Sequence, residues 1–304
     1  MKKSILFAAI PALLLTACSS DEPAQDSRVA AQIVAGIDGP QSRANGNMWE
    51  ADQIGVTVTS ATASDMASRY ANVLYTTTST TDVAAFESTT PIYFQDAHET
   101  VTFSAYAPYA STLTANAISF DAAEQSTRAA QKAFDFIFAE GATANRANPT
   151  VSFSGAHKFS HRMARLVVTV KPGKDFTLDD IKGGSYTVGE IFTAGSFNTL
   201  TGVATVPDGA VAVDYSLAKS IRTDAETAIS YSAILVPQQQ TPAYTFAATI
   251  GGQVYRNSSA IAGKFEAGKS YSYTFTVNKT GIELVASEVS DWDNQDNVEG
   301  DATM

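Results

Sequence analysis

Cysteine and histidine are almost absent from this chain. Its 304 residues include 1 cysteine, Cys18, and 3 histidines. A single thiol excludes an internal disulfide and a structural metal site built from several cysteines. His157 and His161 lie four residues apart, but no His-Glu-x-x-His pattern accompanies them, so a zinc site is the weaker alternative to two polar residues at a domain junction.

Positive charge is scarce as well. The chain has 20 lysines and arginines against 31 aspartates and glutamates, and its formal net charge is −11. This balance disfavours nucleic acid and anionic membrane surfaces as partners. The hydrophobic content of 44% is sufficient for folded cores.

Recognisable catalytic and phosphate-binding motifs are also missing. The sequence has neither a glycine-rich phosphate loop nor a paired nucleophile and base. Asp291, Asp293 and Asp296 resemble the start of a calcium loop, but the glycine and the final glutamate of an EF-hand are not at the required positions. An acidic, solvated strand end is the simpler interpretation. We therefore predict no enzymatic activity, no cofactor and no metal.

The N-terminus has the pattern of a cleaved export signal over residues 1–17. Lys2 and Lys3 precede an apolar run over 5–15, which is too short for a membrane-spanning helix. The small residues before Cys18 resemble the lipobox of bacterial lipoproteins, in which this cysteine becomes the acylated first residue. Several acyl chains give stable anchoring, so we predict a surface lipoprotein of the outer membrane, attached through lipid (palmitate-type) chains.

A polar, acidic linker over 18–27 separates this anchor from the first predicted strand. The strand has apolar side chains at every second position, namely Val29, Ala31, Ile33, Ala35 and Ile37. A turn cluster over 38–40 and a polar connector follow it. The connector contains Arg43 and Ala44, and an exposed basic site of this kind invites proteolysis.

Most of the remaining sequence predicts short strands separated by turn residues, as in antiparallel sandwiches. Loop residues are predicted over 60–68, and a short helix or loop over 122–132. The β-branched run 166–170 is typical of a strand that is covered on both faces. The clearest alternation lies in 271–277, where aromatic residues and valine alternate with serine and threonine.

Two series of strands suggest two domains, and the predicted boundary lies near residue 160. We predict an N-terminal β-sandwich over 28–160 and a C-terminal β-sandwich with a tail over 161–304. The chain also has 12 tyrosines. Most of them fall at strand-period positions and are expected in cores, although exposed ones could form a platform for sugar stacking.

Several segments together resemble the fimbrillin-like family of surface lipoproteins, which build pili in anaerobic gut and oral bacteria. The residues that carry the resemblance are Cys18 with its lipobox, Trp49 with 52–56, 92–94, 101–109, 159–166, 234–238, 267–271 and Trp292. The resemblance covers nearly the whole chain. It implies an all-β fold of two tandem transthyretin-like antiparallel β-sandwich domains.

The resemblance also implies a pilus (fimbrium) structural subunit or tip adhesin that is exported as a precursor. In this family an arginine-specific protease removes the first strand and leaves an open groove. A strand from a neighbouring subunit then fills this groove. Here the matching bond is Arg43–Ala44. The donor candidate is the segment with Ile282, Leu284 and Ala286, although its alternation breaks at Glu288.

The implied partners are other pilus subunits, the protease, the outer membrane and a ligand on a host or bacterial surface. The implied location is the outer membrane first and the extracellular pilus after processing. A surface glycan-binding lipoprotein that does not polymerise is the alternative. It would bind polysaccharide through exposed tyrosine or tryptophan side chains in the uncleaved monomer.

Overall fold

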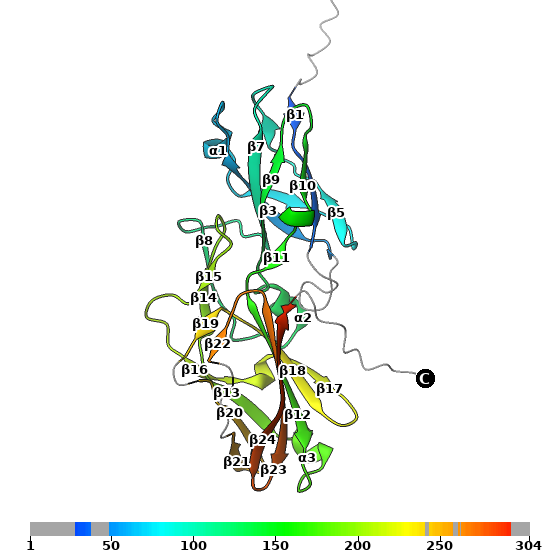
Figure 1. Cartoon of the computed structure of the whole chain (residues 1–304), viewed down its shortest axis with the longest axis vertical. Coiled ribbons are helices and arrows are strands. Elements are labelled where there is room, and N and C mark those ends of the chain that lie inside the picture. Colours follow the sequence, from blue (N-terminus) through cyan, green and yellow to red (C-terminus); the bar gives the residue numbers. More distant parts are fainter. Residues whose placement is uncertain (1–27, 38–48, 241–242, 258–260, 262, 293–304) are drawn as a thin grey trace, which may run out of the picture.

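The structure, a computed structural model, describes residues 28–37, 49–240, 243–257, 261 and 263–292 (Figure 1). These residues form many short strands, mostly antiparallel, and very few helical turns. The expected all-β class is therefore confirmed. No helix in the described ranges has the length and apolarity needed to cross a membrane.

Three sheets form the N-terminal half, which lies at the upper end of Figure 1. The first, in spatial order, is β10 (Thr150–Phe153), β2 (Gln32–Gly36) and β5 (Val83–Phe86). The second is β11 (Ser160–His161), β9 (Ile137–Ala144), β7 (Val101–Ala107), β3 (Gln53–Ser60) and β4 (Val73–Thr76). The third pairs β1 (Val29–Ala30) with β6 (Tyr93–Phe94).

The C-terminal half is built on a five-stranded sheet. Its order is β17 (Ile221–Asp224), β18 (Ile229–Leu235), β12 (Ala164–Pro172), β23 (Lys269–Asn278) and β24 (Gly281–Asp291). A four-stranded sheet has the order β16 (Val213–Ser216), β13 (Ser185–Ile191), β20 (Phe246–Ile250) and β21 (Gln253–Arg256). The small pair is β19 (Gln238–Gln239) with β22 (Lys264–Phe265).

One further sheet joins the two halves. Its strands are β15 (Ala204–Thr205), β14 (Ala194–Asn198) and β8 (Ala117–Asp121). β8 follows β7 in the chain but pairs with β14 of the C-terminal half, with Ser119 opposite Ser196. The segment between β7 and β9 therefore packs on the C-terminal half, on the far side of the boundary predicted near residue 160.

The helices are short. They are α1 (Met66–Arg69), α2 (Arg128–Lys132) and α3 (Leu178–Lys182), with 3-10 turns at Gly155–His157 and Leu217–Lys219. Thr177 caps α3 in a capping box with Asp180. α2 lies within 122–132, where a short helix or a loop was predicted, and the helix occupies only the last five residues of that range. α1 was not predicted: its first three residues lie in the predicted loop 60–68, and Arg69 lies just beyond it. Arg69 is 3.9 Å from Asp65, a weak ion pair.

Two clusters of buried apolar side chains fill the two halves, and a third lies between them. The first contains Ile33, Trp49, Phe103 and Phe153, and the second contains Leu166, Tyr186, Phe246 and Phe275. The third cluster draws on both halves and comprises Tyr106, Phe136, Phe138, Met163, Phe197, Ala204, Ile234, Val236 and Trp292. The molecule is thus held together across its middle by shared apolar packing.

The burial pattern of β23 confirms the alternation predicted for 271–277. Tyr271, Tyr273, Phe275 and Val277 are buried, and the serine and threonine residues between them are half-buried. The prediction for 166–170 was wrong. In β12, Val167 and Thr169 are only half-buried while their neighbours are fully buried, so this β-branched run has one covered face rather than two. A β-branched residue suits a half-buried strand as well as a buried one.

Candidate functional site

The first predicted strand lies in the interior of the N-terminal sheet. β2 is the central strand between β5, which is antiparallel to it, and β10, which is parallel to it. Ile33 is opposite Val151 on one side and Phe86 on the other. A strand with partners on both sides satisfies its backbone groups in two ladders, so its loss would leave both neighbours with unpaired edges.

The backbone bonds continue beyond the ends of β2. The Ala31 amide donates to the Ile92 carbonyl at 2.8 Å, and the Gln32 amide donates to the Pro149 carbonyl at 2.9 Å. At the other end, the Phe159 amide donates to the Gly36 carbonyl at 3.1 Å. The whole segment over 29–37 is therefore embedded in the N-terminal half.

The alternate side chains of this segment point into the core. Ala31, Ile33, Ala35 and Ile37 have exposed fractions of 4%, 2%, 0% and 8%, and Val29 is partly buried against the same cluster. Full burial of one isoleucine side chain contributes roughly 1.5–3 kcal/mol. Removal of the segment would thus open an apolar groove between β5 and β10.

Trp49, the first described residue after the connector, lies against this segment. Its indole nitrogen Nε1 donates a buried hydrogen bond to the Ala35 carbonyl at 3.0 Å. Its ring makes edge-on contacts with Phe86 and Phe159, with centroids 4.8 and 5.4 Å apart. Trp49 is therefore part of the buried surface against which the first strand packs.

The residues predicted for processing and lipidation lie outside the described residues. These are Cys18, Arg43 and Ala44. The residues that flank the connector, Ile37 and Trp49, are both buried. Any cut between them would separate the first strand from the rest of the chain.

The candidate donor segment is β24, which lies at the edge of its sheet. It pairs with β23 along its whole length, with a bulge at Val285. Ile282 is buried, Leu284 is half-buried against the C-terminal core, and Ala286 is exposed. The second edge of β24 is therefore open except for a single bridge between Ile282 and Asn257, and its apolar side chains are well buried only near its start.

The end of β24 is anchored by an aromatic contact. Trp292 has an exposed fraction of 1% and its ring stacks on that of His161, with centroids 4.1 Å apart and planes 4° apart. His161 Nδ1 lies 2.6 Å from Asp135 Oδ1. Burial lowers the pKa of the nearby Arg165 guanidinium, and the charge of Asp135 partly opposes this. The contact places His161 between the halves.

The structure separates the two histidines considered for zinc. His157 Nδ1 contacts the Glu140 carbonyl at 2.9 Å, whereas His161 faces Asp135 in the interior. Among the described residues, no three histidine, cysteine or carboxylate side chains gather as a metal site would require. Asp291 contacts Lys269 at 2.5 Å, and Asp293 and Asp296 lie outside the described residues.

Most tyrosines fill cores, as their strand positions predicted. Tyr75, Tyr106, Tyr186, Tyr215, Tyr231, Tyr244, Tyr271 and Tyr273 are buried. Burial raises the pKa of Tyr75 and of Tyr106 to about 12, so both stay protonated at physiological pH. Tyr70, Tyr93, Tyr109 and Tyr255 are half-buried and keep part of their rings at the surface.

Comparison with known proteins gives consistent results at the levels of family, sequence and fold. A family model described as fimbrillin-like matches residues 42–292. Fim1C of Bacteroides uniformis, named as a candidate fimbrium subunit, is 31% identical over 312 residues, which cover 96% of each chain.

Two solved structures have a similar fold. A candidate cell adhesion protein from Bacteroides uniformis has a TM-score of 0.67 and 27% identity, and the match covers 88% of this chain and 99% of that one. Another from Bacteroides ovatus has a TM-score of 0.69 and 24% identity, with 89% and 100% covered.

Proposed function

This chain belongs to the fimbrillin-like family, whose members are structural and adhesion proteins rather than enzymes, and we propose that it is the precursor of a fimbrium subunit. It is exported as a lipoprotein on Cys18 and reaches the cell surface. There, an arginine-specific protease cuts at Arg43–Ala44. The first strand leaves, and a strand of a neighbouring subunit replaces it.

The position of β2 carries this proposal. A strand with partners on both sides leaves a gap bordered by two ladders, and an incoming strand can restore both sets of main-chain hydrogen bonds. Its alternate side chains would fill the places of Ile33 and Ala35, which are buried. An open groove of this kind is an aggregation hazard, so a strand that fills it until export is complete protects the precursor.

The indole N–H of Trp49 offers the incoming strand a buried hydrogen-bond donor. Its indole N–H donates to the Ala35 carbonyl, and this donor would lose its acceptor when the first strand leaves. A buried donor without an acceptor costs about 1–3 kcal/mol. A replacing strand that presents a carbonyl at the same place removes this cost, which favours one register of insertion.

We assign the donor role to β24, with Ile282, Leu284 and Ala286 as the inserted side chains. Their spacing of two matches that of the segment they replace. β24 is an edge strand, so leaving its sheet breaks one ladder, with β23, and the single bridge between Ile282 and Asn257. Donation also requires Trp292 to leave His161.

We further propose that the two halves are tandem transthyretin-like β-sandwich domains. The separate core clusters support two units. The pairing of β8 with β14 means that the segment between β7 and β9 extends from the N-terminal unit and packs on the C-terminal unit. This contact would keep the two domains of each pilus subunit in a fixed relative orientation.

The test uses the unlipidated protein over 19–304 and an arginine-specific protease. The expected outcome is a new N-terminus at Ala44, followed by higher oligomers in size-exclusion chromatography. Arg28 is also exposed, but a cut there leaves the first strand in place. Arg28→Gln should therefore polymerise normally and Arg43→Gln should stay monomeric. An intact Arg43, or cleaved monomers that never assemble, would overturn the proposal.

The donor role is tested separately. Leu284→Asp should leave cleavage at Arg43 unchanged but prevent polymerisation, because a carboxylate cannot enter an apolar groove without a partner. Val285→Asp is the matched control, since Val285 is 49% exposed and lies at the bulge. If Leu284→Asp polymerised as well as Val285→Asp, this segment would be excluded as the donor.

A further inference from the structure

Residues 122–136, which we call the bridging segment, contact both halves of the molecule. The segment belongs to the N-terminal half by sequence, because it lies between β7 and β9, and its helix α2 is near the middle of the molecule in Figure 1. Charged side chains of α2 bind the N-terminal half, and two glutamine side chains bind the C-terminal half. Through these contacts the segment connects the first strand with β24, the candidate donor strand.

On the N-terminal side, two cations of α2 bind carboxylates that follow Trp49 in the chain. Lys132 Nζ lies 2.9 Å from Asp52 Oδ1 and 3.3 Å from Glu50 Oε2. Arg128 also pairs with Glu50. Asp52 is buried, and a partly buried ion pair is screened less by salt than an exposed one. Because Glu50 directly follows Trp49, whose indole binds the first strand, the cations of α2 fix the backbone beside that contact.

On the C-terminal side, two buried glutamines bind the backbone of β18. The Gln125 side-chain amide donates to the Ile234 carbonyl at 2.7 Å and accepts from the Ile234 amide at 2.7 Å. Gln131 Nε2 donates to the Ser232 carbonyl at 2.9 Å. The pairing of β17 with β18 ends at Ser232, so Gln125 continues this edge of the sheet where β17 stops. The bridging segment is thereby fixed on the C-terminal half.

The end of the bridging segment leads to β24. Asp135 Oδ1 contacts His161 Nδ1 at 2.6 Å, and the His161 ring stacks on Trp292, which immediately follows β24. The Asp135 amide donates to the Lys132 carbonyl at 3.3 Å. Lys132 and Asp135 thus belong to one turn of backbone, and a displacement of Lys132 displaces the carboxylate that contacts His161.

We propose that the bridging segment couples the two strands, so that β24 is held firmly while the first strand is in place and is released more easily after its loss. The coupling rests on the proposed exchange of strands. Loss of the first strand takes the Ala35 carbonyl away from the Trp49 indole, which is unfavourable for a buried donor. A shift of Trp49 displaces Glu50 from Lys132, and α2 then no longer fixes Asp135 against His161. Packed contacts change between discrete arrangements, so a small shift can be passed on in this way.

Coupling of this kind orders the steps of assembly. A precursor that keeps β24 bound does not donate it before the first strand has been cut away, so joining follows cutting. By thermodynamic linkage the effect is reciprocal, and release of β24 weakens the hold on the first strand by the same factor.

The first test uses intact protein over 19–304 and does not depend on cleavage. Hydrogen exchange of the β24 amides is measured in the parent and in Lys132→Met. The matched control is Arg222→Met, which breaks the ion pair with Asp224 on β17, at the opposite edge of the same sheet. Relative to β20, exchange in β24 should be at least about fivefold faster in Lys132→Met, the lower end of coupling between sites, and unchanged in the control.

Two more variants of the intact protein follow the coupling to its start. Glu50→Gln should act in the same direction as Lys132→Met, because Glu50 binds both cations of α2. Trp49→Phe, which removes the hydrogen bond to the Ala35 carbonyl, should speed exchange in β24 more than in β20. The same change should add little in a protein that already carries Lys132→Met. Thermal unfolding checks that all variants fold.

The second test uses protein that has been cut at Arg43 and separated from its first strand. Loss of the strand should speed exchange in β24 at least about fivefold in the parent and add little in Lys132→Met. If Arg43 is not cut, the proposed function fails, and the intact variants still decide whether the coupling exists. The coupling is overturned if Lys132→Met exchanges like Arg222→Met in β24, if β20 accelerates as much as β24, or if Trp49→Phe acts equally with and without Lys132.

Discussion

The indole ring of Trp292 stacks on the imidazole ring of His161, with centroids 4.1 Å apart and planes nearly parallel. Trp292 immediately follows β24, the last strand of the C-terminal half, and His161 belongs to β11, which pairs with β9 of the N-terminal half. The contact therefore connects the candidate donor strand to the unit that would receive a donor from another subunit. Its strength should influence how easily β24 is released.

Trp292→Ala should destabilise the uncleaved protein by about 3–5 kcal/mol, the range for loss of a large buried aromatic side chain. Val289→Ala on the same strand is the control, because Val289 is 53% exposed and its loss should change the free energy of unfolding by less than about 0.5 kcal/mol. Urea unfolding measures both. Equal effects would mean that Trp292 does not anchor β24.

His161 and Asp135 should act as a coupled pair. Because both side chains are buried and their atoms lie 2.6 Å apart, His161→Ala and Asp135→Ala should each destabilise the protein. The double variant should lose less than the sum of the single losses, with a coupling of about 0.5–3 kcal/mol in a double-mutant cycle. Strictly additive losses would show that the two side chains stabilise the junction independently.

Trp49→Phe should lower the free energy of unfolding of the uncleaved protein by about 1–3 kcal/mol. Phenylalanine keeps an aromatic ring but leaves the buried Ala35 carbonyl without the indole donor. If the first strand leaves on cleavage at Arg43, the variant and the parent should differ less in the cleaved monomer, which has no Ala35 carbonyl. A difference that persists unchanged after cleavage would contradict the proposed role of this hydrogen bond.

Glu99 should make the stability depend on pH in the acidic range. Burial alone would raise the pKa of this carboxyl group, but hydrogen bonds from the Ser64 hydroxyl and from the amides of Ala63 and Ser64 outweigh burial and lower it. A lowered folded-state pKa contributes stability above the unfolded-state pKa, and this contribution is lost as the pH falls through the folded-state pKa.

Glu99→Gln should therefore unfold more easily than the parent at neutral pH, and the difference should shrink as the pH falls below the usual range of a glutamate. Thermal unfolding as a function of pH measures this. Glu283→Gln is the control, since Glu283 is an exposed residue of β24. If Glu99→Gln and the parent differed equally at all pH values, the carboxylate would not be the source of the effect.

The strands with one buried face could be predicted from the sequence, because period-two alternation is local information. The alternation in 271–277 marks β23, and Ala31, Ile33 and Ala35 mark the segment that includes β2. Their partners could not be predicted. Any alternating strand can pair with any other, so nothing in β8 indicates that it leaves the N-terminal half for β14.

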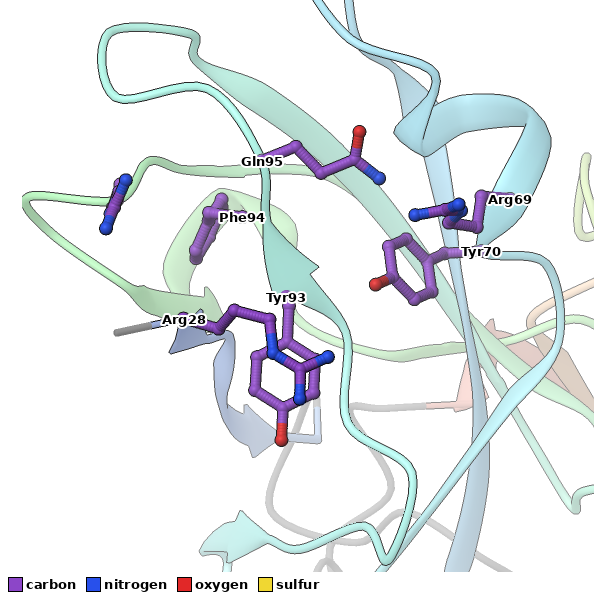
Figure 2. A pocket seen from close by; sticks show the side chains of 7 residues that line it. Arg28, Arg69, Tyr70, Tyr93, Phe94 and Gln95 are labelled. Carbon is purple, nitrogen blue, oxygen red and sulfur yellow. The ribbon is translucent and has the colours of Figure 1, made fainter. Parts of the chain in front are cut away.

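A pocket at the outer end of the N-terminal half, whose lining includes Arg28, Arg69 and Arg146 (Figure 2), could not be predicted either. Arg28, Arg69 and Arg146 are far apart in the sequence, and each is unremarkable in its own segment. Only the packing of the start of β1, the end of α1 and the turn between β9 and β10 brings them together. In contrast, His161 could be expected at the junction because it lies where the two series of strands meet. Nothing in the sequence around Asp135 indicated that it would be the partner of His161.

The parallel pairing of β2 with β10 also determines the order in which the molecule can form. Ile33 is among the first described residues to emerge during synthesis, but its partner Val151 emerges only when about half of the chain has been made. Ordering such a distant pair requires closure of a long loop, which slows folding. The strand that is made first therefore completes its second ladder late: it can pair with β5 early, but its pairing with β10 must wait until residues 150–153 have been made.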